Sequence, residues 1–386
     1  MNIVIAIDSF KGCISSVDSG RLLKQAIEEV YPGDVVSVFP LADGGEGTVD
    51  AMTQGLNGRI VKAPVTGPLG STKVESRYGL LPDTKTAVIE MADASGLPLV
   101  PPEKRNPLHT TTYGLGELIL AAIDAGCRHF IIGIGGSATN DCGLGMLTAL
   151  GFRFLKADGS SAGITGGDLA DVAQIDATQA DSRLQDCTFE IACDVTNPLC
   201  GPEGCSNVFG PQKGATEAIV ARMDDDIHHF AQLAEKACGI KGQEMAGAGA
   251  AGGLGFTFHT FLHGTLTPGS ELILSAIGIK EALSKADLLV TGEGRMDKQT
   301  AMGKGPAGVA QLAKSCQPHC LTVALCGSAA RDAERINQHG IDAYFPILHA
   351  PMTLQEAMDR ATTEQNLRQT VQQVMHLIHQ TVASRA

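Results

Sequence analysis

The sequence predicts an α/β protein: a Rossmann-like parallel-sheet domain built from both chain ends, with a second, inserted α/β domain that contains a mixed sheet. Short β-branched runs alternate with helical patterns near both termini, and the middle holds neighbouring strand patterns joined by short turns. The 386 residues also exceed one typical domain. Because chain termini often lie close together, we expect residues 1–60 and 285–386 to form one discontinuous domain and residues 61–284 the inserted domain.

The two ends of the chain show the alternation of a parallel sheet covered by helices. Residues 2–7 form an apolar run of strand length, and residues 14–31 carry helical periodicity that stops at Pro32 and Gly33. A strand at 35–39 and a short helix at 47–52 follow. Near the other end we expect strands at 287–291, 321–325 and 341–345, and helices at 307–314 and 354–382.

The middle of the chain is less regular. Short turns separate strand patterns at residues 59–65, 73–79 and 86–91, which favours antiparallel pairing. The later predicted elements are a helix at 112–125, strands at 130–134 and 189–193, and a long helix at 217–238. Residues 246–255 are almost all Gly and Ala, and they fit either a helix start packed against backbone or a flexible joint.

Composition excludes several classes of protein. A net charge of −13 without a basic cluster argues against nucleic-acid binding and against binding to anionic lipid. No apolar run approaches the roughly 20 residues of a membrane span, and the first residues lack the basic region of a signal peptide. Eleven cysteines without a dense framework fit free thiols in a reducing compartment, so a cytoplasmic location is expected.

The first candidate site follows the first predicted strand, where ligands of open α/β sheets bind. Asp8, Ser9 and Lys11 together suit the binding of phosphate or carboxylate. The alternative is that Asp8 or Ser9 caps the following helix. The residues alone leave these two interpretations about even.

The second predicted strand leads into a loop with three glycines and two acids. The backbone of Gly44 and Gly45 could line an anion site, and Asp43 and Glu46 offer the hard oxygen ligands that Mg²⁺ prefers. A tight loop before an acidic helix start is the alternative. We favour the ligand-binding interpretation over the plain tight loop, because two such loops follow consecutive predicted strands.

A third loop, at residues 133–141, follows the predicted strand at 130–134. Gly133, Gly135 and Ala138 match the dinucleotide pattern G-x-G-x-x-A, and Asp158 lies where a ribose-binding acid would be expected. This match supports an NAD(P)-dependent hydroxy-acid oxidoreductase as a rival function. The polar residues of the loop fit phosphate oxygens and a metal better, and the candidates here are Gly135, Gly136, Ser137 and Asn140.

Two further segments in the middle of the chain carry motifs. Asp194 and Asn197 follow the strand at 189–193, where Asp194 could be a general base or a metal ligand, or could form an Asx turn. A second G-x-G-x-x-G, at Gly247, Gly249 and Gly252, follows no predicted strand, so we interpret it as a packing feature.

The last candidate loop follows the strand at 287–291. It offers cations for anionic groups and carboxylates for a metal or a base, in the residues Gly292, Glu293, Gly294, Arg295, Asp297 and Lys304. The Walker pattern is absent because Gly305 follows Gly303-Lys304, and neither H-R-D nor D-F-G is present. Polar, Gly-rich loops at strand ends that share one sheet edge supply what phosphoryl transfer needs.

These loops resemble the signatures of the bacterial glycerate kinase family of the glycolate and glucarate pathways. The matching segments are residues 5–11, 42–48, 135–141, 193–200 and 291–300, in family order, and Ile7 stands where the family most often has Pro. The resemblance implies a two-domain kinase that transfers the ATP γ-phosphate to D-glycerate. It implies 2-phosphoglycerate as the usual product, with 3-phosphoglycerate as the alternative.

The residue roles within that reaction are our own hypotheses. Asp194 or Asp297 would take the proton of the glycerate hydroxyl, while Lys11 and Arg295 would hold phosphate or the glycerate carboxylate. Mg²⁺ would be bound by Asp43, Glu46 and Glu293, and the backbone of Gly135–Ser137 would hold phosphates. An alternative function, a sensor that binds its ligand without turnover, rests on the same loops. The sequence leaves open whether the protein forms a homodimer.

Overall fold

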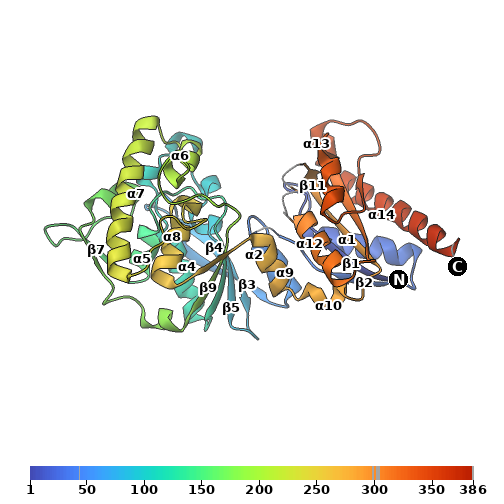
Figure 1. Ribbon diagram of the computed structural model, residues 1–386, viewed down its shortest axis with the longest axis horizontal. Helices are drawn as coiled ribbons and strands as arrows, with labels where there is room; N and C mark the ends of the chain where they lie inside the picture. Colours follow the sequence, from blue (N-terminus) through green and yellow to red (C-terminus); the bar gives the residue numbers. More distant parts are fainter. Residues whose placement is uncertain (43, 298–299, 301–304, 385–386) are drawn as a thin grey trace. The chain divides into compact units, whose positions relative to one another are not determined.

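The computed structural model describes residues 1–42, 44–297, 300 and 305–384. The predicted metal ligand Asp43 and the predicted phosphate-binding Lys304 lie outside these residues. The chain divides into two compact units (Figure 1). Unit 1 comprises Met1–Asp43, Asp50–Leu56 and Ser270–Ala386, and unit 2 comprises Gly44–Val49 and Asn57–Gly269.

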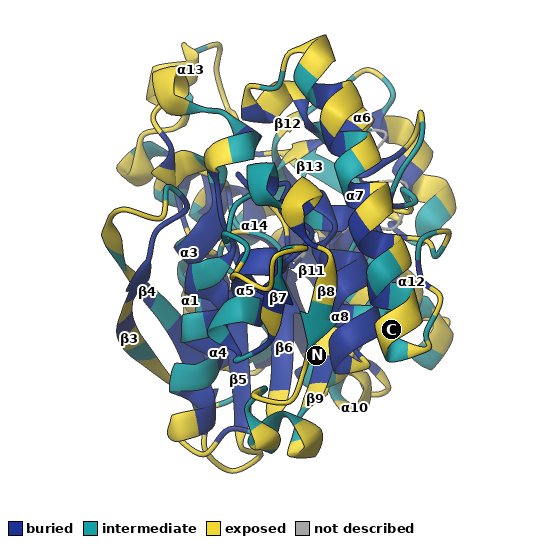
Figure 2. Ribbon diagram, turned by 90° about the vertical axis from the view of Figure 1, so that its left-hand side faces the viewer, coloured by how far each residue is buried: buried dark blue, intermediate teal, exposed yellow. Residues whose placement is uncertain are grey.

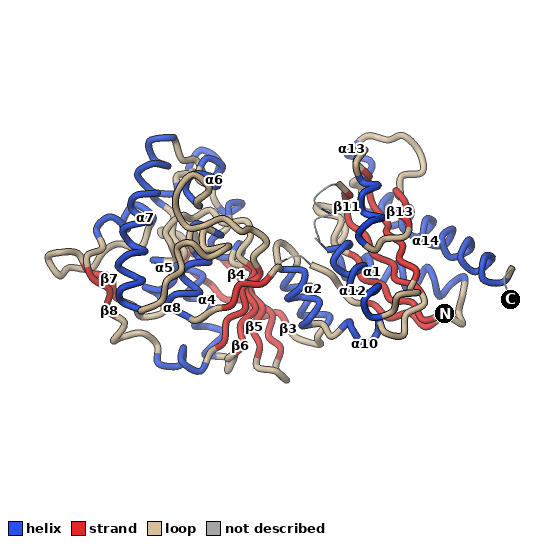
Figure 3. Tube along the Cα trace, in the orientation of Figure 1, coloured by secondary structure: helices blue, strands red, loops and turns tan. Residues whose placement is uncertain are grey.

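Unit 1 is built on a parallel sheet in the strand order β13-β12-β11-β1-β2. Figure 3 draws the strands of this sheet in red and the helices beside them in blue. Its strands are β1 (Asn2–Ile7), β2 (Val35–Val38), β11 (Leu288–Met296), β12 (Leu321–Ala329) and β13 (Ala343–Pro346). Its helices are α1 (Ser16–Val30), α9 (Gly269–Ala276), α10 (Ile279–Leu283), α12 (Gly305–Cys316), α13 (Leu354–Ala357) and α14 (Arg360–Ala383). The two chain ends therefore contribute to one sheet and its helices.

Both faces of the unit 1 sheet are buried, as a parallel sheet requires. Ile3, Ile5 and Ile7 of β1 pack with Leu23 of α1 and Val371 of α14 in one apolar cluster. On the other face α12 packs against β11 and β1. Each fully buried side chain of this kind contributes about 1.5–3 kcal/mol to burial free energy.

The predicted single helix at 354–382 is wrong in one respect. It is two helices, α13 and α14, because two capping signals lie within it. Thr353 and Glu356 form a capping box at the start of α13, and Asp359 accepts a hydrogen bond from the Thr362 N–H at the start of α14. A capping side chain satisfies backbone N–H groups that have no partner in the preceding turn, so the chain begins a new helix there.

Unit 2 is built on a mixed sheet in the strand order β10-β9-β6-β5-β4-β3. These strands are β3 (Arg59–Thr66), β4 (Lys73–Leu81), β5 (Thr86–Glu90), β6 (His129–Gly133), β9 (Thr188–Ala192) and β10 (Thr265–Thr267). The β3–β4 and β4–β5 pairs are antiparallel, whereas the β5–β6, β6–β9 and β9–β10 pairs are parallel. The mixed sheet that the sequence predicted for the inserted domain is confirmed.

Helices and one small sheet complete unit 2. The helices are α3 (Ala92–Ser95), α4 (Tyr113–Asp124), α5 (Leu144–Ala149), α6 (Cys205–Phe209), α7 (Glu217–Cys238) and α8 (Leu254–Leu262). The helix α2 (Thr48–Gly55) begins in unit 2 and continues in unit 1. A separate antiparallel pair consists of β7 (Arg153–Leu155) and β8 (Gln174–Asp176).

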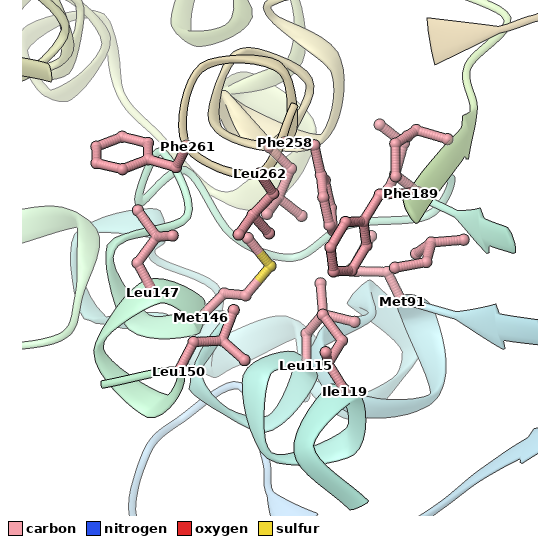
Figure 4. Packing of buried hydrophobic residues seen from close by; sticks show 14 of the residues in the cluster. Met91, Leu115, Ile119, Met146, Leu147, Leu150, Phe189, Phe258, Phe261 and Leu262 are labelled. Atoms are coloured by element: carbon pink, nitrogen blue, oxygen red, sulfur yellow. The ribbon is translucent and has the colours of Figure 1, made fainter. Parts of the chain in front are cut away.

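The core of unit 2 lies between its sheet and its helices. Figure 4 shows Leu115 of α4, Met146 of α5 and Phe258 of α8 packed near Phe189 of β9. Figure 2 shows β5 and β6 as buried, whereas residues along α7 alternate between buried and exposed. None of the described helices is both long enough and apolar enough to cross a bilayer. The eleven cysteines, all within the described residues, are free, as expected.

Candidate functional site

Unit 1 contains a cavity of about 460 Å³ at the carboxyl ends of its parallel strands. Segments after β1, in the last parts of β11 and β12 and after β13 all reach it, which is where ligands of open α/β sheets bind. Seven residues predicted from sequence line it: Asp8, Ser9, Lys11, Glu293, Gly294, Arg295 and Asp297. The structure therefore brings the first and last predicted loops together.

The loop after β1 is held by a serine that sequence analysis overlooked. Ser16, the first residue of α1, donates a 2.7 Å hydrogen bond from Oγ to the carbonyl oxygen of Ile7 and accepts one of 2.8 Å from the Leu41 N–H. The end of β1, the start of α1 and the segment after β2 are thereby tied together. Next to this point the Ser9 N–H donates a 2.6 Å hydrogen bond to Asp8 Oδ1.

Glu293 is an acid of the cavity whose pKa is shifted by its surroundings. Burial raises the pKa of Glu293 to about 7, and the negative charges of Asp8 and Asp297 act in the same direction. The Thr300 hydroxyl, which donates a 2.5 Å hydrogen bond to Glu293 Oε1, and the Lys11 cation lower the pKa. Carboxylates crowded in one wall favour the binding of a cation or the sharing of a proton.

The cations of the same cavity are Lys11 and Arg295, both on exposed positions of its lining. Gly292, just before Glu293, does not line the cavity. It has a φ of 156°, and a Cβ there would lie 2.0 Å from the carbonyl oxygen of Leu325 on β12. Gly292 is thus required for the close approach of two strands, a role that its sequence position did not reveal.

In unit 2, three predicted loops meet at the carboxyl ends of β5, β6 and β9. A Cβ on Gly133 would lie 2.0 Å from the carbonyl oxygen of Gly44, and one on Gly44 would lie 2.5 Å from the Cβ of Ala192. The Val49 N–H donates a 2.8 Å hydrogen bond to the buried carboxylate of Glu90 at the end of β5. This arrangement places Gly45 and the exposed Glu46 at the same sheet edge.

The loop at 133–141 presents backbone to solvent and most of its polar side chains to the interior. Gly135 and Gly136 are exposed, whereas Ser137 and Asn140 are buried. Ser137 Oγ accepts a 3.0 Å hydrogen bond from the Thr139 N–H, and Asn140 Nδ2 donates one of 2.9 Å to Ser206 Oγ. The accessible part of this loop is therefore the Gly135–Gly136 backbone.

Two buried side chains hold the 133–141 loop on its interior side: Asp141, at the end of the loop itself, and Lys213, from a distant segment. Asp141 Oδ2 accepts hydrogen bonds from the N–H and the hydroxyl of Thr112, both 2.8 Å long, and burial raises its pKa. Lys213 is only 2% exposed and donates a 2.6 Å hydrogen bond to the carbonyl oxygen of Thr139. No local pattern in the sequence distinguishes Lys213 from a surface lysine, so its role was not predictable.

Asp194 and Asn197 follow β9 at the same edge of the sheet. Asp194 Oδ1 accepts a 2.9 Å hydrogen bond from the Gly269 N–H, and Asn197 Nδ2 donates one of 2.8 Å to the carbonyl oxygen of Glu203. The Gly/Ala stretch packs beneath them: a Cβ on Gly249 would lie 2.3 Å from the carbonyl oxygen of Pro198. The second glycine motif is a packing feature, as predicted.

The dinucleotide interpretation of the 133–141 loop lacks its structural context. The strand that follows the loop, β7, pairs with β8 and not with β6, whose neighbours are β5 and β9. Asp158 lies in an exposed turn, where its Oδ1 accepts hydrogen bonds from the N–H and hydroxyl of Ser160. A ribose-binding acid would end the adjacent parallel strand.

The fold and these loops define an α/β protein with polar, glycine-rich segments at the carboxyl ends of its strands. The chain belongs to the glycerate kinase family, whose model matches residues 3–379. It is 49% identical over 361 residues to the glycerate kinase of Bacillus subtilis, covering 94% of each chain. It is 46% identical over 357 residues to the glycerate 2-kinase of Escherichia coli K12, covering 92% of this chain and 93% of the relative.

A solved structure shows the same fold over the whole chain. The crystal structure of a protein assigned as glycerate kinase 2 in Salmonella typhimurium LT2 superposes with a TM-score of 0.91 at 44% identity. The match covers 99% of both chains. The predicted fold class and the resemblance stated from sequence are both confirmed.

Proposed function

We propose that this protein transfers the γ-phosphoryl group of ATP to the 2-hydroxyl of D-glycerate, giving 2-phospho-D-glycerate and ADP. The observation that carries the proposal is membership of the glycerate kinase family over nearly the whole chain, together with a unit 1 cavity lined by Lys11, Arg295 and three carboxylates. The 2-position is supported by the Escherichia coli relative, which is called glycerate 2-kinase. Phosphorylation at the 3-hydroxyl is the alternative.

Cations and backbone N–H groups would hold the anionic parts of the two substrates. Lys11 and Arg295 line the unit 1 cavity and would bind phosphate oxygens or the glycerate carboxylate. In unit 2 the exposed backbone of Gly135 and Gly136 would hold phosphate oxygens. Gly44 and Gly45 would contribute in the same way, because their loop packs on the ends of β6 and β9.

The acids of the unit 1 cavity fit Mg²⁺. Its ligands in kinases are commonly one or two carboxylates plus substrate phosphates, and the magnesium ion neutralises charge that develops on the phosphates. Asp8, Glu293 and Asp297 line one cavity, and the negative charges of the two aspartates raise the pKa of Glu293. No group of three His, Cys, Asp or Glu side chains among the described residues forms a ready metal site. Asp8 and Glu293 would share the ion with phosphate.

The base that takes the glycerate proton is proposed to be Asp297 or Asp194. Asp297 lines the unit 1 cavity beside the proposed phosphate-binding Arg295. Asp194 is exposed after β9 in unit 2, where the Gly269 N–H fixes one of its oxygens. A carboxylate in hydrogen-bond reach of the hydroxyl would accelerate the transfer by general base catalysis.

The test is release of ADP in a coupled assay over a panel of hydroxy acids. We expect ADP formation that depends on both glycerate and Mg²⁺, and NMR of the product should show phosphate on the 2-hydroxyl. A product phosphorylated at the 3-hydroxyl would overturn the regiochemistry. Binding of glycerate and ATP without any ADP formation would favour a sensor, and tight NADH binding would favour the oxidoreductase.

A further inference from the structure

The unit 1 cavity has an apolar wall that the proposed phosphate chemistry does not use. Phe10 and Ile347 are buried in it, whereas Leu348, Leu354 and Met358 are 36%, 76% and 41% exposed. These residues come from the loop after β1, the segment after β13 and the helix α13 with its C-cap. Three large exposed apolar side chains therefore surround one cavity.

Such a cluster differs from the other exposed apolar side chains of the described residues. Leu99, Val208 and Leu377, for example, are exposed on separate segments of the chain and need no explanation. Apolar side chains gathered around a hollow with polar groups opposite mark a ligand-binding surface. The polar groups of the same cavity are the cations Lys11 and Arg295 and the three carboxylates.

The apolar side chains also lie next to the segment that carries Lys11. Met358 Cε would lie 3.1 Å from a Cβ built on Gly12, the residue next to Lys11. Met358 is held at this place by the turn between α13 and α14. The Thr363 hydroxyl donates a 2.9 Å hydrogen bond to the carbonyl oxygen of Ala357, and Cys13 Sγ donates one of 3.0 Å to Thr363 Oγ1.

A ligand that fits both walls joins an apolar group to an anionic group. A three-carbon hydroxy acid has no such group, and it is much smaller than a cavity of about 460 Å³. A purine nucleotide has both parts. We propose that Phe10, Leu348, Leu354 and Met358 form the subsite for the purine base of the nucleotide, with its phosphates directed toward Lys11 and Arg295. This inference rests on the proposed kinase function and assigns the nucleotide to unit 1.

The chain contains no tryptophan, so a single introduced tryptophan reports on one place. In Leu354→Trp the indole replaces the most exposed side chain of the wall. We expect ADP to quench its fluorescence saturably, because purine and indole would stack, and we expect neither tripolyphosphate nor glycerate to do so. The matched control is Leu377→Trp on α14, about 21 Å along that helix from Thr363, which should not respond.

Steady-state kinetics give a second measurement that needs no probe. Met358→Glu should raise the KM for ATP about tenfold or more, because it places a like charge beside the nucleotide, and leave the KM for glycerate nearly unchanged. Met358→Leu keeps an apolar side chain and should behave like the wild type. Equal increases in both KM values would overturn the assignment.

The two experiments separate the subsite from the function. Glycerate-dependent ADP formation by the wild type, with no quenching of Leu354→Trp by ADP and no change of KM for ATP in Met358→Glu, would overturn the subsite and leave the function standing. Equal quenching by ADP and tripolyphosphate would also overturn it. Specific quenching by ADP without any turnover by the wild type would support the subsite and overturn the proposed function.

Discussion

Lys213 Nζ donates a 2.6 Å hydrogen bond to the carbonyl oxygen of Thr139, although 74 residues separate the two in sequence. Both residues are buried, so this cation supports the loop that carries Gly135 and Gly136 from the interior of unit 2. Burial lowers the pKa of Lys213 to about 8, while the charge of the buried Asp141 acts in the opposite direction. A buried lysine of this kind couples the stability of unit 2 to pH.

The first prediction is a pH-dependent contribution of Lys213 to stability. Between about pH 8 and the unfolded pKa of 10.5, the folded protein has lost the Lys213 proton and the unfolded chain still binds it. The free energy of unfolding therefore rises with pH over this interval, and the gain is lost as the pH falls through about 8. From about pH 7.5 to about pH 9.5, the wild type should gain on the order of 2 kcal/mol relative to Lys213→Met.

Urea unfolding of both proteins at several pH values measures this difference. Lys62→Met controls for the loss of a lysine, because Lys62 lies on the surface in an ion pair with Glu75. A difference between wild type and Lys213→Met that stays constant with pH would show that Lys213 is not the titrating group.

The second prediction concerns the packing of two loops on β6. An alanine at Gly133 would place its Cβ 2.0 Å from the carbonyl oxygen of Gly44, and backbone atoms cannot rotate away as a side chain can. We expect Gly133→Ala to lower the free energy of unfolding by about 1–3 kcal/mol or more. Gly135→Ala is the matched control, because its Cβ would meet the Cα of Gly45 at 3.8 Å, an ordinary contact. Equal midpoints of urea unfolding for the two variants would contradict the argument.

Most of the fold could be predicted from the sequence because buried parallel strands produce recognisable apolar runs. Elements that escaped were short or lacked their usual signals. β8 and β10 have three residues each, too few for a pattern. The helix α8 begins after Gly253, which has a φ of 94° and no capping side chain, so its start looks like part of the Gly/Ala stretch. The break between α13 and α14 could have been predicted from its capping residues, Thr353, Glu356 and Asp359.

The candidate site was predictable where each loop carries its own signal. Glycines and polar residues directly after a predicted strand indicated the segments at Asp8, Glu46 and Glu293, although Glu293 itself lies in the last part of β11. The apolar wall was not predictable, because Phe10, Leu348 and Met358 come from distant segments and each alone resembles an ordinary core residue. For the same reason the contact between Lys213 and Thr139 has no signature in the sequence.

The third prediction tests the proposed phosphate-binding cation of the loop after β1. Lys11→Ala removes a positive charge from the wall that also carries Asp8, Glu293 and Asp297. The phosphates would then face these carboxylates with only one of the two cations, Arg295, remaining, so we expect kcat/KM to fall by about 100-fold or more. Lys11→Arg should retain more activity than Lys11→Ala, because it keeps the charge. Activity of Lys11→Ala close to that of the wild type would remove Lys11 from the site.

The last prediction decides between the two proposed bases. Asp297→Asn and Asp194→Asn keep the size of the side chain and an oxygen that accepts hydrogen bonds, so the Gly269 N–H keeps an acceptor in the second variant. In the variant that lacks the true base, turnover should fall by about 100- to 10,000-fold, with little change in the binding of ATP and glycerate. Asp158→Asn, in an exposed turn, is the matched control and should keep full turnover. Single-turnover kinetics measure the effect on the chemical step, and equilibrium binding measurements report the effect on substrate affinity separately. Near-normal turnover in both variants would exclude Asp297 and Asp194 together, because a carboxamide cannot take the proton of the hydroxyl.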